Sequence, residues 1–442
     1  MSPKRSASRR SPEWAERLAR LRAAQLAVVV GLAIVTLLLY VNLASSERKV
    51  EHPIPHLYAT GDSQFVRTMG SLLGPAFVPA NRVTSLLNGD QAFPAMLEAI
   101  RSARRTITFE SYIYWSSRVG REFTEALSEG ARAGVRTHLL LDWAGSQNVD
   151  RDDFEQMRKA GVDVVLYRAP HWYQLGRLNR RTHRKLLIVD GRIGFTGGMG
   201  VGDQWRGHAQ DRDHWRDSQF RAEGPVVAQL QAAFMDDWFE TEGAVLDGPG
   251  YFPDLDPVGS ELAQVFRSSP EDGNGNLRLM FLLAIASASR RILIANAYFV
   301  PDRMTVDMLV AARRRGVEVE IVVPGPILDA QVVRRASRAK WGPLLEAGVR
   351  IYEYQPTMYH VKLMVVDDVW VSVGSTNFDD RSFRLNQEAN LNVLDPGFGA
   401  AQARVFAEDR GRSRRVTLEE WRHRSVWERI QERFAGVMQK QL

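Results

Sequence analysis

The sequence contains one short motif twice, and this repetition constrains the fold more than any other feature. Each copy has a His, a Lys two residues later, an Asp five residues after the Lys and a Gly seven residues after the Asp. The copies are His183-x-Lys185-x4-Asp190 before Gly197 and His360-x-Lys362-x4-Asp367 before Gly374. One copy alone would fit an exposed strand edge, but two copies with identical spacing indicate a duplicated chain.

The residues before the motifs repeat as well. MLEAIRSARRTITFESYIY resembles LLAIASASRRILIANAYFV, and GARAGVRTHLLLD resembles AARRRGVEVEIVV. Helical stretches of about 10–15 residues alternate with short apolar strands, which is typical of βαβ units. We expect a duplicated α/β fold, with two mixed β-sheets flanked by helices about a pseudo-two-fold axis. The halves are predicted at residues 81–255 and 256–410.

An apolar run near the N-terminus predicts a membrane helix. Residues 26–41 carry no charge, and with their apolar flanks they reach the ~20 residues that span a bilayer. Seven Lys or Arg precede the run, whereas only Arg48 and Lys49 follow closely. The alternative, a cleaved signal peptide, fits poorly with so long a basic segment. We expect a basic segment (1–25), a transmembrane helix (26–44) and a linker (45–80) in a single-pass cell-membrane protein. Its N-terminus is predicted to be cytoplasmic and its body to lie on the opposite side.

The net charge of +6 is concentrated at the two ends of the chain. Residues 411–442 are predicted to form an amphipathic basic helix, which either docks on the domain or lies at a membrane interface. The body between the ends is slightly acidic, which argues against a channel for nucleic acid. The chain has no Cys, which excludes disulfides, thiolate metal sites and a Cys nucleophile.

The residue types of the motifs indicate phosphoryl transfer. In a strand, residues i and i+2 point to the same side, so each His lies beside its Lys. A duplicated fold brings the two His-Lys units together. Two lysines supply positive charge for a phosphodiester, while one imidazole attacks phosphorus and the other protonates the leaving alkoxide. No metal and no cofactor are required, and we expect none.

At these residues the chain resembles the phospholipase D superfamily, and within it the bacterial cardiolipin synthases. The resemblance extends over ESYIYW, HWRDSQFRAEGPVV, NAYFVPD, GSTNFDDRSFRLNQE and TLEEWRHRS. It implies His183 as nucleophile and His360 as general acid, with Lys185 and Lys362 on the phosphate.

The resemblance also assigns supporting residues. Asp190 and Asp367 complete the catalytic motifs in a structural role. An acid beyond each motif orients a histidine: Asp217 matches this role in the first half and Glu388 in the second. Ser375 and Asn377 are expected to bind phosphate. In the first half Gly200 stands where the family usually has the asparagine, so one phosphate donor is missing there.

The predicted function is cardiolipin synthesis from two phosphatidylglycerols with release of glycerol, through a phosphohistidine. The expected partners are phospholipids and the membrane, without nucleic acid, and the sequence leaves the oligomeric state open. The first alternative is a phospholipase D that hydrolyses phospholipids to phosphatidic acid. A nuclease of the same superfamily and an inactive membrane-bound binding protein are less favoured, because the body is slightly acidic and both His-Lys pairs are intact.

Overall fold

The computed structural model describes residues 13–43, 50–169, 179–269 and 275–437, and the chain forms two compact units, residues 1–48 and 49–442. The first unit is helix α1 (Glu13–Leu43). Its stretch Arg17–Leu38 has a mean hydropathy of 2.1 and no buried residues, so it is long and apolar enough to cross a membrane. The helix begins before the predicted span and includes much of the basic segment. Predictions for residues 1–12, 44–49, 170–178, 270–274 and 438–442 lie outside the described residues.

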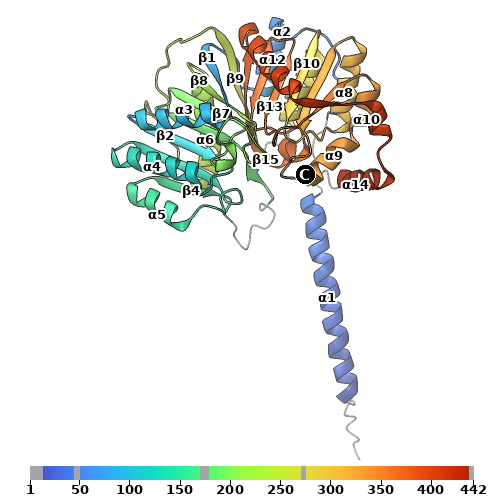
Figure 1. The fold of residues 1–442 in the computed structure, drawn as a ribbon. Coiled ribbons are helices and arrows are strands. Elements are labelled where there is room, and N and C mark those ends of the chain that lie inside the picture. The colour runs from blue at the N-terminus through green and yellow to red at the C-terminus, as the bar shows by residue number, and fades with distance from the viewer. Residues whose placement is uncertain (1–12, 44–49, 170–178, 270–274, 438–442) are drawn as a thin grey trace, which may run out of the picture. The chain divides into compact units, whose positions relative to one another are not determined.

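The second unit is a duplicated α/β structure (Figure 1). Its main sheet has the strand order β4-β3-β2-β6-β7-β8-β1-β9-β15-β14-β13-β10-β11-β12-β16. Apart from β16 at one edge, equivalent strands of the halves follow each other in mirrored order around the β1–β9 junction. This order is that of a pseudo-two-fold axis between β1 and β9, and it confirms the predicted fold class.

The halves are joined more closely than two separate sheets would be. β1 and β9 pair antiparallel at Val78↔Ala263 and Asn81↔Glu261, so the two predicted sheets are hydrogen-bonded into one. Both halves also share a core with helices α6 and α12, which includes Leu186 from one half and Leu363 from the other.

Two further cores cover the remaining faces of the sheet. In the first half, α3 and α4 pack on the sheet through residues such as Phe93 and Phe123. In the second half, α7, α8 and α10 pack in the same way, with Phe281 and Leu309 among the buried residues. Buried strands such as β6 (KLLIV) and β13 (KLMVV) are fully enclosed between layers, which is why they read as continuous apolar runs.

The elements of the first half follow each other in the order strand, helix, strand that the sequence pattern predicts. They are β1 (Val78–Leu87), α3 (Asn88–Ser102), β2 (Thr106–Ser111), α4 (Arg118–Arg132), β3 (Arg136–Asp142), α5 (Arg151–Ala160), β4 (Asp163–Tyr167), β5 (Arg181–Thr182), β6 (Lys185–Val189), β7 (Ile193–Gly197), η2 (Asp203–Trp205), β8 (Ser218–Glu223) and α6 (Val227–Glu242).

The second half repeats this order with local differences. Its elements are β9 (Glu261–Ser268), α7 (Asn276–Ser287), β10 (Arg291–Asn296), α8 (Arg303–Arg314), β11 (Glu318–Pro324), α9 (Gln331–Ala339), α10 (Trp341–Glu346), β12 (Arg350–Tyr354), β13 (Lys362–Val366), β14 (Trp370–Gly374), α11 (Asp380–Arg384), β15 (Asn386–Leu394) and α12 (Pro396–Gly411).

Two predicted segments need correction. Within the expected linker, residues 63–73 form α2 (Ser63–Leu73), and Phe65 and Met69 are fully buried in the second-half core. The linker was predicted from its Gly and Pro residues, most of which flank the helix, while Gly70 lies within it. The expected C-terminal helix is also interrupted. Residues 413–437 form β16 (Ser413–Val416), which pairs with β12, followed by α13 (Leu418–Arg422) and α14 (Val426–Val437).

Candidate active site

The two motif histidines meet in one cavity between the halves of the second unit. His183 and His360 stand just before β6 and β13, strands that occupy equivalent places in the sheet. The cavity has a volume of about 350 Å³. It is lined by Tyr112, Ile113, Arg181, His183, Lys185, Trp205, Trp215, Tyr298, Asp329, Val333, His360, Asn377, Asp379, Arg381, Ser382 and Asn386.

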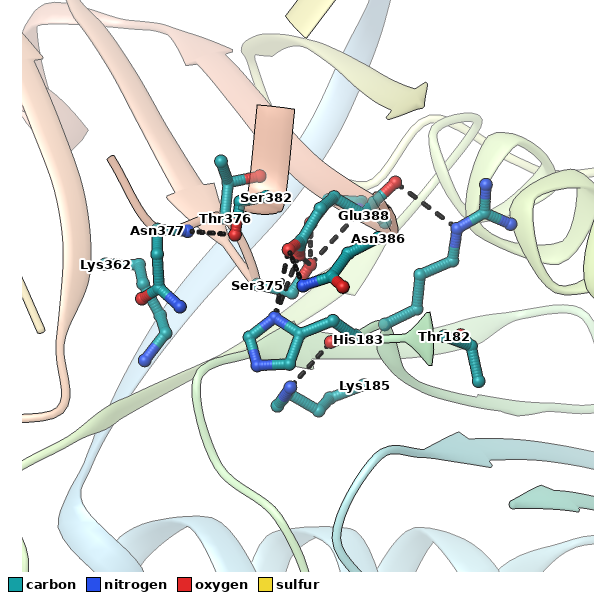
Figure 2. Close-up of polar contacts among 12 residues, drawn as sticks. Thr182, His183, Lys185, Lys362, Ser375, Thr376, Asn377, Ser382, Asn386 and Glu388 are labelled. Atoms are coloured by element: carbon teal, nitrogen blue, oxygen red, sulfur yellow. Dashed lines mark hydrogen bonds and ion pairs between the residues drawn. The ribbon is translucent and has the colours of Figure 1, made fainter. Parts of the chain in front are cut away.

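Each histidine is held by the acid of the other half. His183 Nδ1 lies 3.1 Å from both carboxylate oxygens of Glu388, as Figure 2 shows. His360 Nδ1 lies 2.7 Å from Asp217 Oδ2. A carboxylate accepts hydrogen bonds, so Nδ1 carries the proton in each ring and Nε2 is left to react. The sequence assigned each acid to its own half, and the structure exchanges the partners.

Backbone pairing between the halves enforces this exchange. The segment before β6 includes β5, which pairs parallel with β15, and His183 N donates to Gln387 O at 2.9 Å. The second half repeats the arrangement, since His360 N donates to Arg216 O at 2.8 Å. The acid follows immediately after each of these carbonyls. Each histidine is therefore fixed beside the acid of the opposite half before any side chain is considered.

Burial controls the protonation of the two imidazoles. It lowers the pKa of His183 to about 4, an effect that Glu388 opposes and Lys185 reinforces. It also lowers the pKa of His360, together with Lys362, while Asp217 acts in the opposite direction. Both rings favour the neutral form in the free protein, and a negative phosphodiester between them would favour a proton on one of them.

Each lysine lies beside the motif histidine that precedes it by two residues, as Figure 2 shows for Lys185 and His183. Lys185 Nζ donates to His183 O at 2.5 Å, and Lys362 Nζ donates to His360 O at 2.6 Å. Burial lowers the pKa of Lys185 to about 7 and that of Lys362 to about 8. Two ammonium groups with so little solvation are suited to binding a phosphate through charge and hydrogen bonds.

The acids are supported differently in the two halves. Ser375 Oγ is fully buried and donates its single hydrogen to Glu388 Oε2 at 2.5 Å, so it holds the acid and has no hydrogen left for a phosphate. This corrects its predicted role. The equivalent residue in the first half is Gly198, where a Cβ would collide with the Asp217 carboxylate. Trp205 Nε1 donates to Asp217 Oδ2 at 3.0 Å instead.

Asp190 and Asp367 are remote from the cavity and serve the fold. Asp190 accepts backbone N–H groups of residues 104–106, and Asp367 accepts those of residues 289–291. Both aspartates have positive φ, 53° and 56°, which Asp tolerates better than most residues. Each pins the chain entering β2 or β10 to the end of the motif strand. The two aspartates were predicted to complete the catalytic motifs in a structural role. These contacts agree with the structural role and give neither aspartate a part in catalysis.

The missing asparagine of the first half has a steric cause. Asn377 lines the cavity. At Gly200, the equivalent position, a Cβ would lie 2.9 Å from Ile113 Cβ and 3.1 Å from the Trp205 indole. Ile113 and Trp205 line the cavity in its place. The phosphate donors of the two halves therefore differ because aromatic and aliphatic side chains fill one of the two positions.

Sequence reasoning missed Arg184, the residue between His183 and Lys185. It is fully buried, and its Nε donates to Glu388 O at 3.2 Å. Its guanidinium also donates to Gln387 Oε1 at 3.3 Å and lies 3.3 Å from Asp237. Arg184 thus anchors the strand that carries Glu388. The sequence signal for this role was an Arg between the motif His and Lys, directly before the apolar strand β6.

The cavity wall contains further residues that sequence reasoning did not single out. Trp205 and Trp215 pack against each other, with ring centroids 4.9 Å apart, and both contact His360, at 5.6 and 5.3 Å from the imidazole. Tyr112 packs against His183 at 5.1 Å. Most of these residues fall in or near stretches that carried the family resemblance, whereas Asp329 had no sequence signal. Within the described ranges, no three His, Asp or Glu side chains are placed to hold a metal ion.

A duplicated sheet with two facing His-Lys units defines a phospholipase D-like protein, and comparisons with known proteins agree. The family described as "Cardiolipin synthase, PLD-like domain" matches residues 96–238 and 281–410. Cardiolipin synthase 1 of Bacillus cereus is 35% identical over 377 residues, which cover 83% of this chain and 73% of the relative. The major cardiolipin synthase of Bacillus subtilis is 34% identical over 365 residues, covering 82% and 76%. The chain belongs to the cardiolipin synthase family with PLD-like domains.

Solved structures support the fold. Phosphatidylserine synthase from Haemophilus influenzae matches with a TM-score of 0.65 at 14% identity, covering 86% of this chain and 99% of that chain. Polyphosphate kinase from Porphyromonas gingivalis matches with a TM-score of 0.51 at 12% identity, covering 89% and 57%. At these identities the likeness concerns the fold alone.

Proposed function

We propose that the protein is a phosphatidyltransferase that makes cardiolipin from two phosphatidylglycerols and releases glycerol. Family membership supports the reaction. The observation that carries the mechanism is the pair of His-carboxylate contacts facing one cavity, 3.1 Å for His183–Glu388 and 2.7 Å for His360–Asp217. Two oriented imidazoles with adjacent lysines are what a double displacement at phosphorus requires.

In the first step, His183 Nε2 attacks the phosphorus of one phosphatidylglycerol. A P–N bond forms, the P–O bond to the glycerol headgroup breaks, and His360 delivers its proton to the leaving oxygen. Glycerol departs and a phosphatidyl-histidine remains. Glu388 stabilises the positive charge that develops on the His183 ring.

In the second step, the headgroup hydroxyl of another phosphatidylglycerol loses its proton to His360 and attacks the phosphorus. The new P–O bond forms as the P–N bond breaks, which restores His183 and releases cardiolipin. One phosphodiester replaces another, so the reaction needs no activated nucleotide donor. Lys185 and Lys362 stabilise the charge on the phosphoryl oxygens in both steps.

The N-terminal helix supports a membrane location. We propose a single-pass protein anchored through Arg17–Leu38, with a cytoplasmic N-terminus and the catalytic body on the opposite side. The support is the seven Lys and Arg before the uncharged run of residues 26–41, against the two that follow it closely. Anchoring keeps the catalytic body on the membrane that contains its lipid substrates.

Product analysis tests the proposed reaction. The purified full chain is given labelled phosphatidylglycerol as the sole lipid, and the products are separated. Cardiolipin and glycerol in equal amounts are the expected products, because an acceptor held in line outcompetes bulk water. Phosphatidic acid as the main product over a range of lipid concentrations would instead establish a hydrolase. A His183→Ala variant controls for contaminating lipid enzymes.

A further inference from the structure

A tyrosine–aspartate pair lines the cavity without a part in the mechanism above. Tyr298 Oη donates to Asp329 Oδ2 at 2.5 Å, and both residues line the cavity. Tyr298 is half-buried and Asp329 is exposed at the rim. Among the described residues, this is the only hydrogen bond that the Asp329 side chain makes. Its carboxylate therefore retains acceptor capacity that faces a substrate site.

The pair belongs to the His360 end of the cavity. Tyr298 follows β10, whose last residue, Asn296, pairs with Lys362 at the start of β13. Asp329 follows β11, the other neighbour of β10. Burial and Lys362 lower the pKa of His360, and Asp329 is among the charges that oppose this shift. Strand order therefore places both residues at this end of the cavity, and the charge interaction links Asp329 to His360.

Chemistry determines which part of the substrate occupies that end. Displacement at phosphorus is in line, so the alcohol that leaves lies opposite the attacking His183, on the side of His360. The acceptor alcohol attacks from the same side in the second step. Whatever lines the His360 end therefore contacts the headgroup alcohol in both steps.

The two ends of the cavity have different chemical character. The His183 end carries Arg181 and Arg381. Burial lowers the pKa of the Arg381 guanidinium, and the positive charge of Arg181 lowers it further. The His360 end carries the indole of Trp215 and the Tyr298–Asp329 pair. Aromatic faces pack against the C–H groups of a polyol, and a carboxylate accepts its hydroxyl hydrogens.

We propose that Tyr298 and Asp329 form a hydroxyl-recognition subsite for the glycerol headgroup, both as leaving alcohol and as acceptor. The inference rests on the proposed function and adds the residues that select a polyol over a simple alcohol. The carboxylate of Asp329 accepts from a hydroxyl that does not react, and Tyr298 holds the carboxylate in place. A headgroup without that second hydroxyl forfeits this hydrogen bond.

Competition between two three-carbon alcohols tests the subsite in the full chain. With phosphatidylglycerol as donor, labelled glycerol and 1-propanol are supplied at equal concentration, and incorporation into phosphatidylglycerol and phosphatidylpropanol is measured. We expect the protein to favour glycerol. Tyr298→Phe and Asp329→Asn should each reduce the glycerol-to-propanol ratio about tenfold, the loss expected for one hydrogen bond to a charged group, while propanol transfer persists.

Tyr112→Phe is the matched control. It removes a tyrosine hydroxyl from the same cavity, but one that bonds with Arg181 and not with Asp329, on a ring packed against His183. It should leave the ratio unchanged whatever it does to the overall rate. An unchanged ratio in both Tyr298→Phe and Asp329→Asn would overturn the inference while leaving the proposed function intact. Ethanolamine is supplied as a third acceptor to detect a cation site. If Asp329→Asn loses only the transfer to ethanolamine, the inference is also overturned. A parent protein that transfers to water alone would overturn both.

Discussion

Glu388 and His183 are 205 residues apart in the chain, yet both carboxylate oxygens lie 3.1 Å from the imidazole Nδ1. The contact crosses the boundary between the two halves, and His360 and Asp217 make the reciprocal contact. Each half therefore supplies a histidine that only the other half can orient. The site is a property of the junction, and neither half contains a complete reacting unit.

Replacing either histidine should abolish cardiolipin formation, with a loss of at least about 10³-fold, because each imidazole has its own role in both steps. A substrate whose leaving group is p-nitrophenolate separates the roles, since this group departs without a proton. We expect His360→Ala to release one equivalent of p-nitrophenol rapidly and His183→Ala to release none. A burst in His183→Ala and none in His360→Ala would reverse the assigned roles.

Replacing Asp217 or Glu388 should impair the function of the histidine that the acid contacts, which belongs to the other half. With the same p-nitrophenyl substrate, Asp217→Asn should keep the burst because it disturbs only His360. Glu388→Gln should lose it, with a fall of about 10²–10⁴-fold as the His183 tautomer is released. Circular dichroism and the unfolding temperature check that both variants are folded. The opposite pattern would mean that the crossed contacts do not govern catalysis.

Activity should fall as pH rises through the range in which the lysines lose their charge. Burial lowers the pKa of Lys185 to about 7 and that of Lys362 to about 8. A lysine is charged below its pKa, so phosphate binding is lost above these values and kcat/KM declines between about pH 7 and 8. A bound phosphodiester raises both pKa values, so kcat should decline at higher pH than kcat/KM. A kcat/KM that stays level to pH 9 would contradict this.

Gly198→Ala should inactivate the protein, because the added Cβ collides with the carboxylate that orients His360. The control is Gly130→Ala in α4, where a Cβ would meet Ile107 Cδ1 at an ordinary 3.4 Å. There alanine should be neutral or raise stability by up to about 1 kcal/mol, because it favours the helix. Thermal unfolding and initial rates are measured for both. Full activity in Gly198→Ala would show that the Asp217 position tolerates displacement.

Protease added to intact spheroplasts should digest the catalytic body, because the seven Lys and Arg before the uncharged run of residues 26–41 keep the N-terminus inside. A tag at the N-terminus should be protected in the same sample and become accessible only after lysis. A protected body together with a digested tag would reverse the proposed orientation without affecting the chemistry.

The motif residues and the duplicated fold could be predicted because they depend on local spacing and strand pattern. His183, Lys185, His360 and Lys362 are found at the starts of equivalent buried strands. The exchange of Asp217 and Glu388 could not be predicted in this way, since spacing within one half says nothing about which strand of the other half lies beside it.

Local patterns also failed where distant packing decides the outcome. Ser375 follows a motif glycine and was predicted to bind phosphate, but the proximity of Glu388 turns it inward. The Gly and Pro residues around α2 indicated a linker, whereas burial of Phe65 and Met69 in the core stabilises a helix. Asp329 lies in a loop with no periodic pattern, and only the fold brings it to the cavity.

The exchange of acids also bears on how such a chain can evolve. A mutation that displaces Asp217 disables the histidine of the other copy, so neither copy is redundant and selection must retain both. The residues that hold each acid in place need not be the same in the two halves. Ser375 and Gly198 occupy equivalent positions but meet the needs of different neighbours, as do Asn377 and Gly200. Duplication thus made the two copies mutually indispensable at the histidines and left the residues around each histidine free to diverge.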